Sequence, residues 1–207
     1  MFWNAAVALS IAFTAAGYWL QKRKVLEAES GEAISITWLV GGIAASLAKV
    51  IYGEDGGGWA FTVSGLVNLF SKGWLLVYVL HFKTIAKWEK WMATFLGALV
   101  ILMFFAPNAY ASSVRFFGLG LTWKDLSMWL IGIGIFFAQK HELKQGGARG
   151  VFREALPLAT SVSAGLMLAY CFHAGTSGPL VGYFAYIASQ AVFIGENRRA
   201  HRVVNPV

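Results

Sequence analysis

The segment WAFTVSGLVNLFSKGWLLVYVLHF, residues 59–82, decides the fold class of this chain. It is long and apolar enough to cross the hydrocarbon core of a bilayer, which takes about 20 such residues in a helix. A glycine-rich acidic turn at 53–58 precedes it, and Lys83 follows it. Glycine clusters and charged residues end helices where an apolar run stops. The segment therefore predicts a transmembrane helix.

Six further apolar runs lie on either side of this segment. Basic residues follow the first run, and Pro107-Asn108 follows the fourth. We expect residues 109–124 to form an outer loop with a short interfacial piece, because Arg115 and Phe116-Phe117 suit a headgroup layer. The sequence thus predicts an all-α membrane protein with seven transmembrane helices. The other six runs are residues 2–20, 34–52, 91–106, 126–138, 155–173 and 180–195.

The composition favours the same class. Hydrophobic residues make up 57% of the 207 positions and charged residues 13%, whereas soluble domains carry about 25% charged residues. The formal net charge of +7 does not indicate nucleic acid, because the basic residues stand in short clusters between apolar runs. Such clusters are typical of membrane topology. The expected surroundings are therefore a lipid bilayer, in a plasma or inner membrane.

The basic residues also predict an orientation. With the N-terminus outside, 13 of the 17 lysines and arginines fall on the inner side. Only Arg115 and Lys124 then lie outside, and Lys49 and Lys72 fall within spans. An excess of basic residues on the cytoplasmic side is the usual pattern. We therefore expect an outside N-terminus and a cytoplasmic C-terminus.

A shift of 118 residues superposes the first three runs on the last three. Gln21-Lys22 then matches Gln139-Lys140, Tyr52 matches Tyr170, and Ser71 matches Ser189. Such internal repeats are common in transporters. The predicted architecture is two parallel three-helix repeats joined by a linker helix, three plus one plus three. Its parts are a first repeat at 1–83, a linker helix and outer loop at 84–118, and a second repeat with a short tail at 119–207.

Short motifs add a resemblance to a known family. Trp19-Leu20-Gln21 ends the first run, residues 33–38 (AISITW) open the second, Val50-Ile51-Tyr52-Gly53 closes it, and Asn68 stands in the third. With these motifs the first 83 residues resemble a SWEET or SemiSWEET unit of the PQ-loop superfamily. The second half also resembles, through residues 166–170 (LMLAY), the three-helix domain found beside lipid A biosynthesis enzymes.

The resemblance implies a facilitative carrier that binds its solute near the midplane between two three-helix bundles. Asn68 matches the first of the family's two sugar-binding asparagines, and its repeat mate is Tyr186. Lys49 occupies the family's tryptophan position, with Met167 as its mate. The family's proline-glutamine pairs appear here as Leu20-Gln21 and Ala138-Gln139.

Lys72 is the residue that most directly indicates a site. It stands one helical turn after Asn68, so the two share a face. A lysine at mid-bilayer depth costs about 2.5–3.5 kcal/mol and normally faces a bundle interior. No acidic residue lies in any predicted span, which favours a bound ligand, a lipid phosphate or an uncharged lysine. As a functional site, Lys72 would bind an anion or carboxylate together with Lys49. The alternatives are that Lys72 pairs with a carbonyl or snorkels, and that Lys49 snorkels.

The remaining polar residues receive simpler interpretations. Gln190 is expected on the opposite wall, at the level of Lys72, and would complete a solute site of Asn68, Lys72, Lys49, Tyr186 and Gln190. Gln21 and Gln139 are expected to be structural, hydrogen-bonding backbone carbonyls where a helix breaks. The histidines lack ligand spacing, so neither a metal nor a haem is expected. No cofactor and no enzymatic activity are predicted.

Two functions remain open at this point. The first is a SWEET-like facilitative transporter of a small polar or anionic solute. The second is a non-transporting membrane module: a receptor, a lipid-binding protein or an accessory subunit of a larger membrane complex. A homo-oligomer is compatible with both hypotheses.

Overall fold

The computed structural model describes residues 2–53, 58–105, 113–116, 119–122, 137–141, 155–175 and 178–204. Most of the predicted helix at 126–138 lies outside these residues. Only its last two positions are described, and they belong to a helical piece that spans 137–141.

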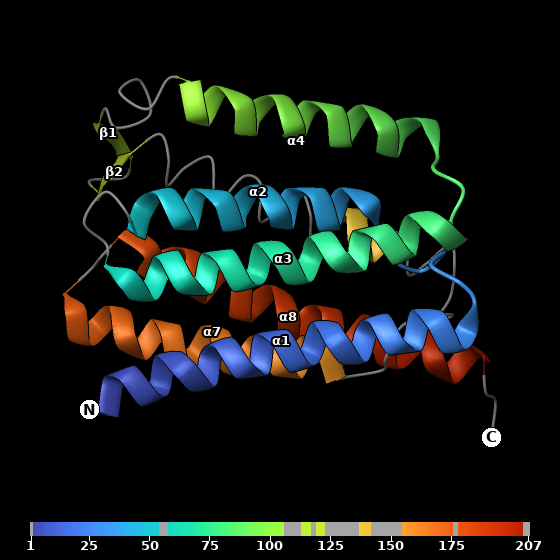
Figure 1. The fold of residues 1–207 in the computed structure, drawn as a ribbon, viewed down its shortest axis with the longest axis horizontal. Coiled ribbons are helices and arrows are strands. Elements are labelled where there is room, and N and C mark those ends of the chain that lie inside the picture. The colour runs from blue at the N-terminus through green and yellow to red at the C-terminus, as the bar shows by residue number, and fades with distance from the viewer. Residues whose placement is uncertain are drawn as a thin grey trace.

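Six helices and one strand pair are described (Figure 1). Helices α1, α3 and α8 run in one direction along the bundle axis, and α2, α4 and α7 run in the other (Figure 1). The elements, in chain order, are α1 (Phe2–Ala28), α2 (Ile36–Tyr52), α3 (Trp59–Phe82), α4 (Lys87–Phe105), β1 (Ser113–Phe116), β2 (Leu119–Thr122), α7 (Ala155–Ala174) and α8 (Gly178–Val204).

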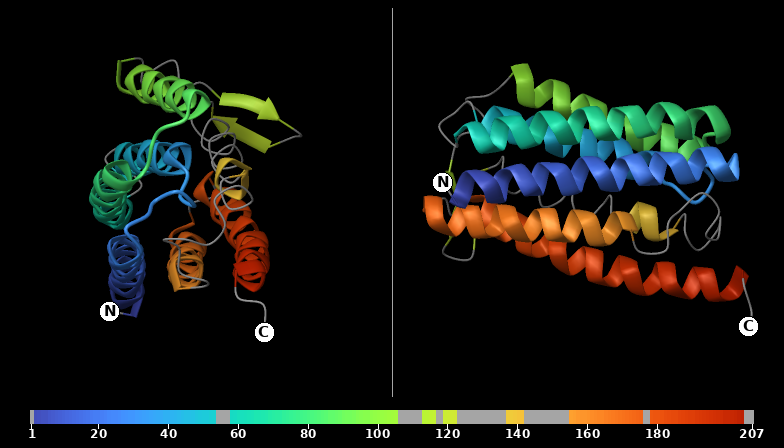
Figure 2. Two further views of the ribbon diagram at one scale, coloured as in Figure 1. Left: turned by 90° about the vertical axis from the view of Figure 1, so that its right-hand side faces the viewer. Right: turned by 60° about the horizontal axis from the view of Figure 1, so that its bottom comes forward.

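Helix α3 packs against both α1 and α2. Helix α1 also packs along α7, and α7 packs against α8. Helix α4 contacts α2 and lies at the edge of the bundle, as the end-on view in Figure 2 shows. Helix α1 therefore lies between α3 on one side and α7 on the other.

Most predicted helix bounds agree with the structure, but the C-terminal ends of α1 and α8 differ. Helix α3 spans the predicted residues 59–82. Helix α1 continues to Ala28, beyond the predicted end at Leu20, because Lys22, Arg23 and Lys24 are good helix formers. Helix α8 likewise continues past Gly195 to Val204.

A short hairpin lies within the segment 109–124, which the sequence predicts to be a loop, and the fold is otherwise all-helical as predicted. Strands β1 and β2 pair antiparallel, with Ser113 opposite Thr122 and Phe116 opposite Leu119. A strand pair satisfies its own backbone hydrogen-bonding groups, which an irregular segment of the same length does not. The described chain is thus helical apart from this one hairpin.

The outer surface of the bundle is strongly apolar. Large hydrophobic side chains are exposed along the helices, among them Trp91 at 77%, Phe2 at 72% and Phe70 at 69%. Soluble monomers rarely expose apolar patches larger than a few hundred Å². The interior, in contrast, holds polar side chains such as Ser10, Gln21 and Glu89. An apolar exterior is the surface expected of helices solvated by lipid, and the buried polar side chains lie beside an apolar core.

Two helices are long and apolar enough to span a membrane, namely Trp59–Phe82 and Ala155–Ala174. The stretch Ile36–Ile51 in α2 is apolar but shorter. Membrane spans pack closely where small residues meet. At the contact between α1 and α7, a Cβ added to Gly17 would lie 2.9 Å from the Cβ of Ala159. The absence of a side chain at Gly17 therefore sets how closely these two helices approach.

Candidate functional site

The ammonium group of Lys72 reaches from α3 to the backbone of α2. Its Nζ donates to the carbonyl oxygen of Gly42 at 2.8 Å and to Oγ of Ser46 at 3.0 Å. The Ser46 hydroxyl itself donates to the Gly42 carbonyl at 2.7 Å. A lysine ammonium has three N–H donors, and these contacts use two of them. Within the described residues, one donor therefore remains for a further acceptor.

Gly42 provides the space that the lysine side chain occupies. A Cβ at this position would lie 3.0 Å from Cδ, 3.1 Å from Cε and 3.2 Å from Nζ of Lys72. Any larger residue on this face of α2 would displace the end of the lysine. The contact with a carbonyl is one of the outcomes expected for Lys72, and it leaves the positive charge without a carboxylate partner within the described ranges.

Lys49 is the second cation in this part of the bundle. It lies about one turn after Ser46 in α2, and its Nζ stands 5.1 Å from the ring centroid of Tyr183 in α8. A cation over an aromatic face is stabilised by the ring quadrupole. Lys49 thus contacts the second half of the chain, whereas Lys72 contacts the first.

Asn68 is half-buried, and its hydrogen bond lies within its own helix. Its Nδ2 donates to the carbonyl of Ser64, one turn earlier, at 2.8 Å. The amide oxygen stays available as an acceptor. Gln190 in α8 is buried, at 7% exposed. Of the five predicted site residues, Lys72 contacts α2, the helix that carries Lys49.

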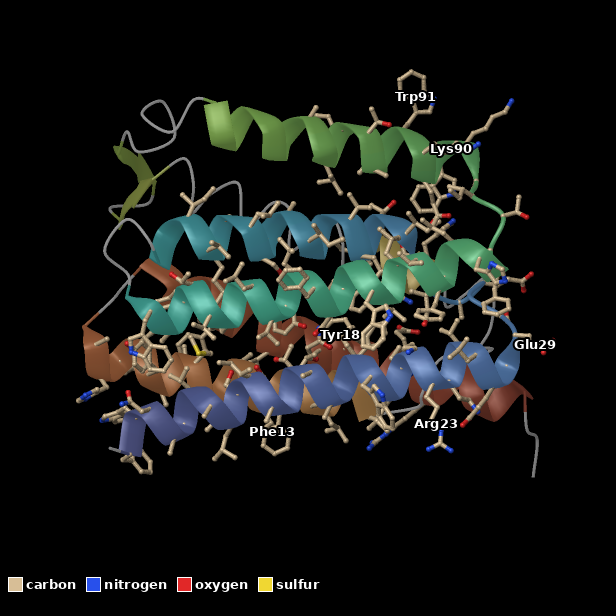
Figure 3. The ribbon with its side chains drawn as sticks, in the orientation of Figure 1. Phe13, Tyr18, Arg23, Glu29, Lys90 and Trp91 are labelled. Carbon is tan, nitrogen blue, oxygen red and sulfur yellow. The ribbon has the colours of Figure 1, made fainter. Side chains whose placement is uncertain are left out.

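Tyr186 belongs to a group of aromatic and hydroxyl side chains that connects both halves. Its hydroxyl shares a hydrogen bond with Thr160 of α7, and it lies close to Tyr18 of α1. The Tyr18 ring stacks on Trp38 of α2, with ring centroids 6.1 Å apart. Figure 3 shows Tyr18 on the side of α1 that faces the bundle, with Phe13 on the opposite side.

The sequence analysis missed Tyr18, although the chain carries a signal for it. The Tyr18 ring is buried, and its hydroxyl makes no hydrogen bond to any residue that the structure describes. Buried polar side chains recur along α1 every three or four residues, at Ser10, Thr14, Tyr18 and Gln21. That spacing places them on one helix face. An unpaired buried hydroxyl costs about 1–3 kcal/mol. A polar ligand that forms a hydrogen bond with the Tyr18 hydroxyl would remove this cost.

The seam between α1 and α7 is polar as well. The hydroxyl of Ser163 in α7 lies 2.8 Å from that of Ser10 and 2.7 Å from that of Thr14. Ser10 also donates to the backbone carbonyl of Ser163 at 3.0 Å. These three buried contacts join the two halves of the chain near the middle of α1.

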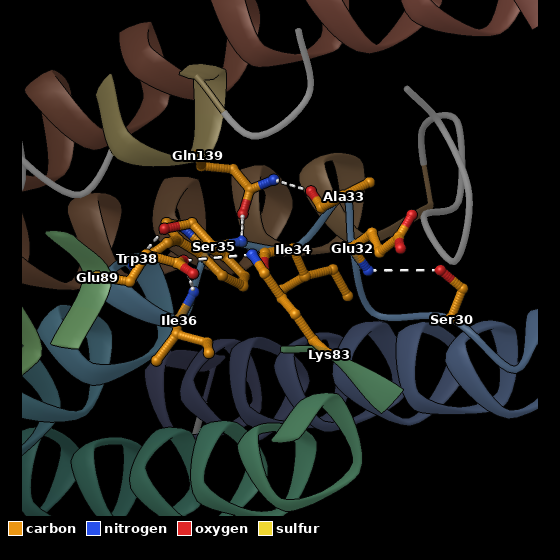
Figure 4. Close-up of polar contacts among 10 residues, drawn as sticks. All are labelled: Ser30, Glu32, Ala33, Ile34, Ser35, Ile36, Trp38, Lys83, Glu89 and Gln139. Atoms are coloured by element: carbon orange, nitrogen blue, oxygen red, sulfur yellow. Dashed lines mark hydrogen bonds and ion pairs between the residues drawn. The ribbon is translucent and has the colours of Figure 1, made fainter. Parts of the chain in front are cut away.

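Gln139 holds the backbone that leads into α2. Its Oε1 accepts from the amide of Ser35 at 2.9 Å, and its Nε2 donates to the carbonyl of Ala33 at 2.7 Å (Figure 4). The carbonyl contact is of the kind expected for a structural glutamine. Gln21 is also buried, at 1% exposed. Both glutamines therefore lie inside the bundle rather than at its surface.

A buried acidic residue lies in the first turn of α4, just before the predicted span at 91–106. Glu89 falls in the first turn of α4, which starts at Lys87 and not at Trp91 as predicted, and it is completely buried. Its Oε1 accepts from the amide of Ile36 at 2.9 Å and lies 3.3 Å from Nζ of Lys83. Lys83 also donates to the carbonyl of Ile34 at 2.9 Å (Figure 4).

The fold and these contacts define a helical bundle with an apolar exterior, two helices able to span a membrane, and cationic and hydroxyl groups inside. Comparison of the chain with protein-family models, with curated proteins and with solved structures found no match.

Proposed function

We propose that the chain is an integral membrane carrier for a small anionic solute, built like the SWEET and PQ-loop proteins from two three-helix repeats and a linker helix. The observation that carries the proposal is Lys72. Its positive charge lies in the middle of the apolar helix α3 with neutral partners only, and one of its donors is available. A charge in such a place marks a solute pathway by default.

Several features support the repeat. When shifted by 118 residues, the start of α2 at Ile36 and that of α3 at Trp59 fall at 154 and 177, one residue before α7 and α8 begin. Residues 33 and 35, which Gln139 binds, fall at 151 and 153, directly before α7.

The proposed topology has seven spans and an outside N-terminus. Basic residues stand near one end of the bundle in several elements: Lys22 in α1, Lys83 after α3, Lys87 and Lys90 in α4, and Arg198 in α8 (Figure 1). The positive-inside rule assigns this end to the cytoplasm.

The solute site that we propose consists of Lys72 and Lys49 as anion ligands, with Asn68, Tyr186 and Gln190 on the surrounding walls. The Tyr18 hydroxyl supplies a further hydrogen-bonding group. A carboxylate or phosphate bound between two lysines makes charge-assisted hydrogen bonds, which are about twice as strong as neutral ones. A neutral sugar would leave both charges uncompensated, so an anion is the better match.

The test is uptake of radiolabelled small carboxylates, phosphate esters and neutral sugars into proteoliposomes. We expect uptake of at least one anion class above empty vesicles, and a loss of about tenfold or more with Lys72→Met, which keeps the length of the side chain but removes its charge. Lys22→Met, at the bundle end, is the control. Uptake of sugars alone, or anion uptake that Lys72→Met leaves intact, would contradict the proposal.

A non-transporting membrane module is the second candidate. It is favoured by the exposed aromatic face of α4, where Trp91 is 77% and Phe95 59% exposed, because aromatic residues are enriched at protein interfaces. Native mass spectrometry of gently extracted protein distinguishes the two. A stoichiometric partner protein, together with an absence of uptake, would establish this second function.

A further inference from the structure

Lys49 and Lys72 reach a similar depth in the bundle from two different helices. Nζ of Lys72, on α3, lies 3.0 Å from Oγ of Ser46 in α2. Lys49 follows Ser46 within the next turn of α2, about 4.5 Å further along the helix axis. Side chains tilt towards the N-terminus of their helix, which for Lys49 is the side of Ser46. Two ammonium groups are therefore presented close to one turn of α2.

The two ammonium groups are directed to different helices. Lys72 is held by the Gly42 carbonyl and the Ser46 hydroxyl, which both belong to α2. Nζ of Lys49 lies 5.1 Å from the ring centroid of Tyr183, which belongs to α8. One charge is thus fixed on the first half of the chain, and the other extends to the second half.

Both ammonium groups have hydrogen-bond donors to offer. Each has three N–H donors, of which Lys72 uses two. The aromatic contact of Lys49 occupies no oxygen acceptor, and no hydrogen bond joins its ammonium to another residue that the structure describes. Both side chains are half-buried and not completely enclosed. Lys49 can therefore donate several hydrogen bonds to a ligand, and Lys72 can donate one.

The balance of charge indicates what kind of ligand suits this pair. Among the described residues, no carboxylate forms an ion pair with either lysine. A buried charge without a counter-charge is strongly unfavourable, and a monoanion would compensate only one of the two. A compact dianion such as phosphate carries both charges on one centre, whereas the two cations are directed to different helices. A short molecule with an anionic group at each end matches both cations.

We propose that the solute is a short dicarboxylate, with one carboxylate bound by Lys72 and the other by Lys49. This inference rests on the carrier function proposed above and names the class of its solute. Lys72 is the fixed end of the site, because two groups of α2 hold its ammonium. Lys49 adapts to the second carboxylate, exchanging its contact with the Tyr183 ring for charge-assisted hydrogen bonds. No covalent bond is made or broken.

The experiment measures the affinity of succinate and of butyrate by calorimetry, with the full chain in phosphatidylcholine nanodiscs at about pH 7.5, where all their carboxyl groups are ionised. The two acids have carbon chains of the same length and differ by one carboxylate. We expect succinate to bind about tenfold or more tightly than butyrate, because it compensates both lysines. Lys49→Met should abolish this difference, since a single cation then remains in the site.

Lys22→Met is the matched control. Its Nζ also lies over an aromatic ring, 3.9 Å from the centroid of Trp74, but at the end of the bundle. This variant therefore loses a lysine and a cation–π contact without touching the site, and we expect it to keep the preference for succinate. Loss of the preference in Lys22→Met, or its survival in Lys49→Met, would overturn the proposal.

The parent chain alone provides a readout that needs no variant to fold. Equal affinity for succinate and butyrate, an absence of succinate binding, or tighter binding of inorganic phosphate than of succinate would each contradict a dicarboxylate site. Calorimetry measures binding without transport, so the two proposals can fail separately. Tight succinate binding without uptake into proteoliposomes would contradict the carrier alone. Uptake that depends on Lys72 but favours butyrate over succinate would contradict the dicarboxylate alone.

Discussion

At the scale of single residues, Gly42 determines where the charge of Lys72 lies. The lysine runs over the bare surface of this glycine to reach its carbonyl, so the position of the ammonium depends on a side chain that is missing. Lys72 belongs to α3, whereas the glycine that makes room for its ammonium group belongs to α2. Neither residue by itself reveals the arrangement.

We predict that Gly42→Ala lowers anion uptake by about tenfold, while the unfolding temperature changes little. The new methyl group would meet only the far end of a flexible side chain, which moves at small cost, but the ammonium would leave its position. Displacements of this size reduce the rate of solute handling far more than stability. Gly73→Ala is the matched control, because a Cβ there would have no neighbour within 4 Å. Equal uptake by the two variants would exclude the role assigned to Gly42.

Lys72 and Glu89 also show how far residue-level prediction reaches. Lys72 could be singled out from the sequence, because a lysine inside an apolar run is unusual whatever its partners are. Glu89 could not, because hydropathy alone places it in a loop before Trp91. Its partner Ile36 is 53 residues away, and no local pattern records such a contact.

At the scale of elements, the seam between α1 and α7 depends on one hydroxyl. Ser163 meets both Ser10 and Thr14 through its Oγ. Hydrogen bonds between membrane helices contribute about 0.6 kcal/mol each on average. A single residue on α7 therefore supports the contact between the two halves of the chain.

We predict that Ser163→Ala lowers the free energy of unfolding in mixed micelles by about 1–2 kcal/mol, since two interhelical hydrogen bonds are lost. Ser161→Ala is the control: Ser161 is on the same helix but bonds only to Pro157 within it, at 2.7 Å. We expect its effect to stay below about 0.5 kcal/mol. A larger loss in Ser161→Ala than in Ser163→Ala would show that the seam contributes little.

Helix existence was easier to predict than helix ends. The bounds of α3 follow from the sequence because a glycine cluster and Lys83 delimit the apolar run. The ends of α1 and α8 do not, because hydropathy marks where a helix leaves the bilayer and not where its hydrogen bonds stop. The hairpin at 113–122 was missed for a related reason, since two strands of four residues are too short to show a clear alternation.

At the scale of the whole molecule, the proposed topology is open to direct measurement. The single cysteine, Cys171, is buried, so Cys171→Ala provides a background without native thiols. Single cysteines can then be placed at exposed alanines, namely Ala28 at the end of α1, Ala86 before α4 and Ala174 at the end of α7.

We predict that an impermeant maleimide added to intact cells labels a cysteine at Ala174 but not at Ala28 or Ala86, which should react only after permeabilisation. The reason is the basic end of the bundle, which the positive-inside rule retains in the cytoplasm. The reverse labelling pattern would invert the topology. Labelling at all three positions in intact cells would exclude spanning helices altogether.

The hydroxyls on α1 also bear on how the two halves move against each other. Ser10 and Thr14 are four residues apart, which is one helical turn and about 6 Å along α1. Both present the same kind of group to Ser163. If α7 slid along α1 by one turn, Ser163 would exchange two partners for one, and its hydroxyl would still be bonded. A change of register by one turn would thus keep Ser163 bonded to one hydroxyl of α1, while the other hydroxyl would lose this partner.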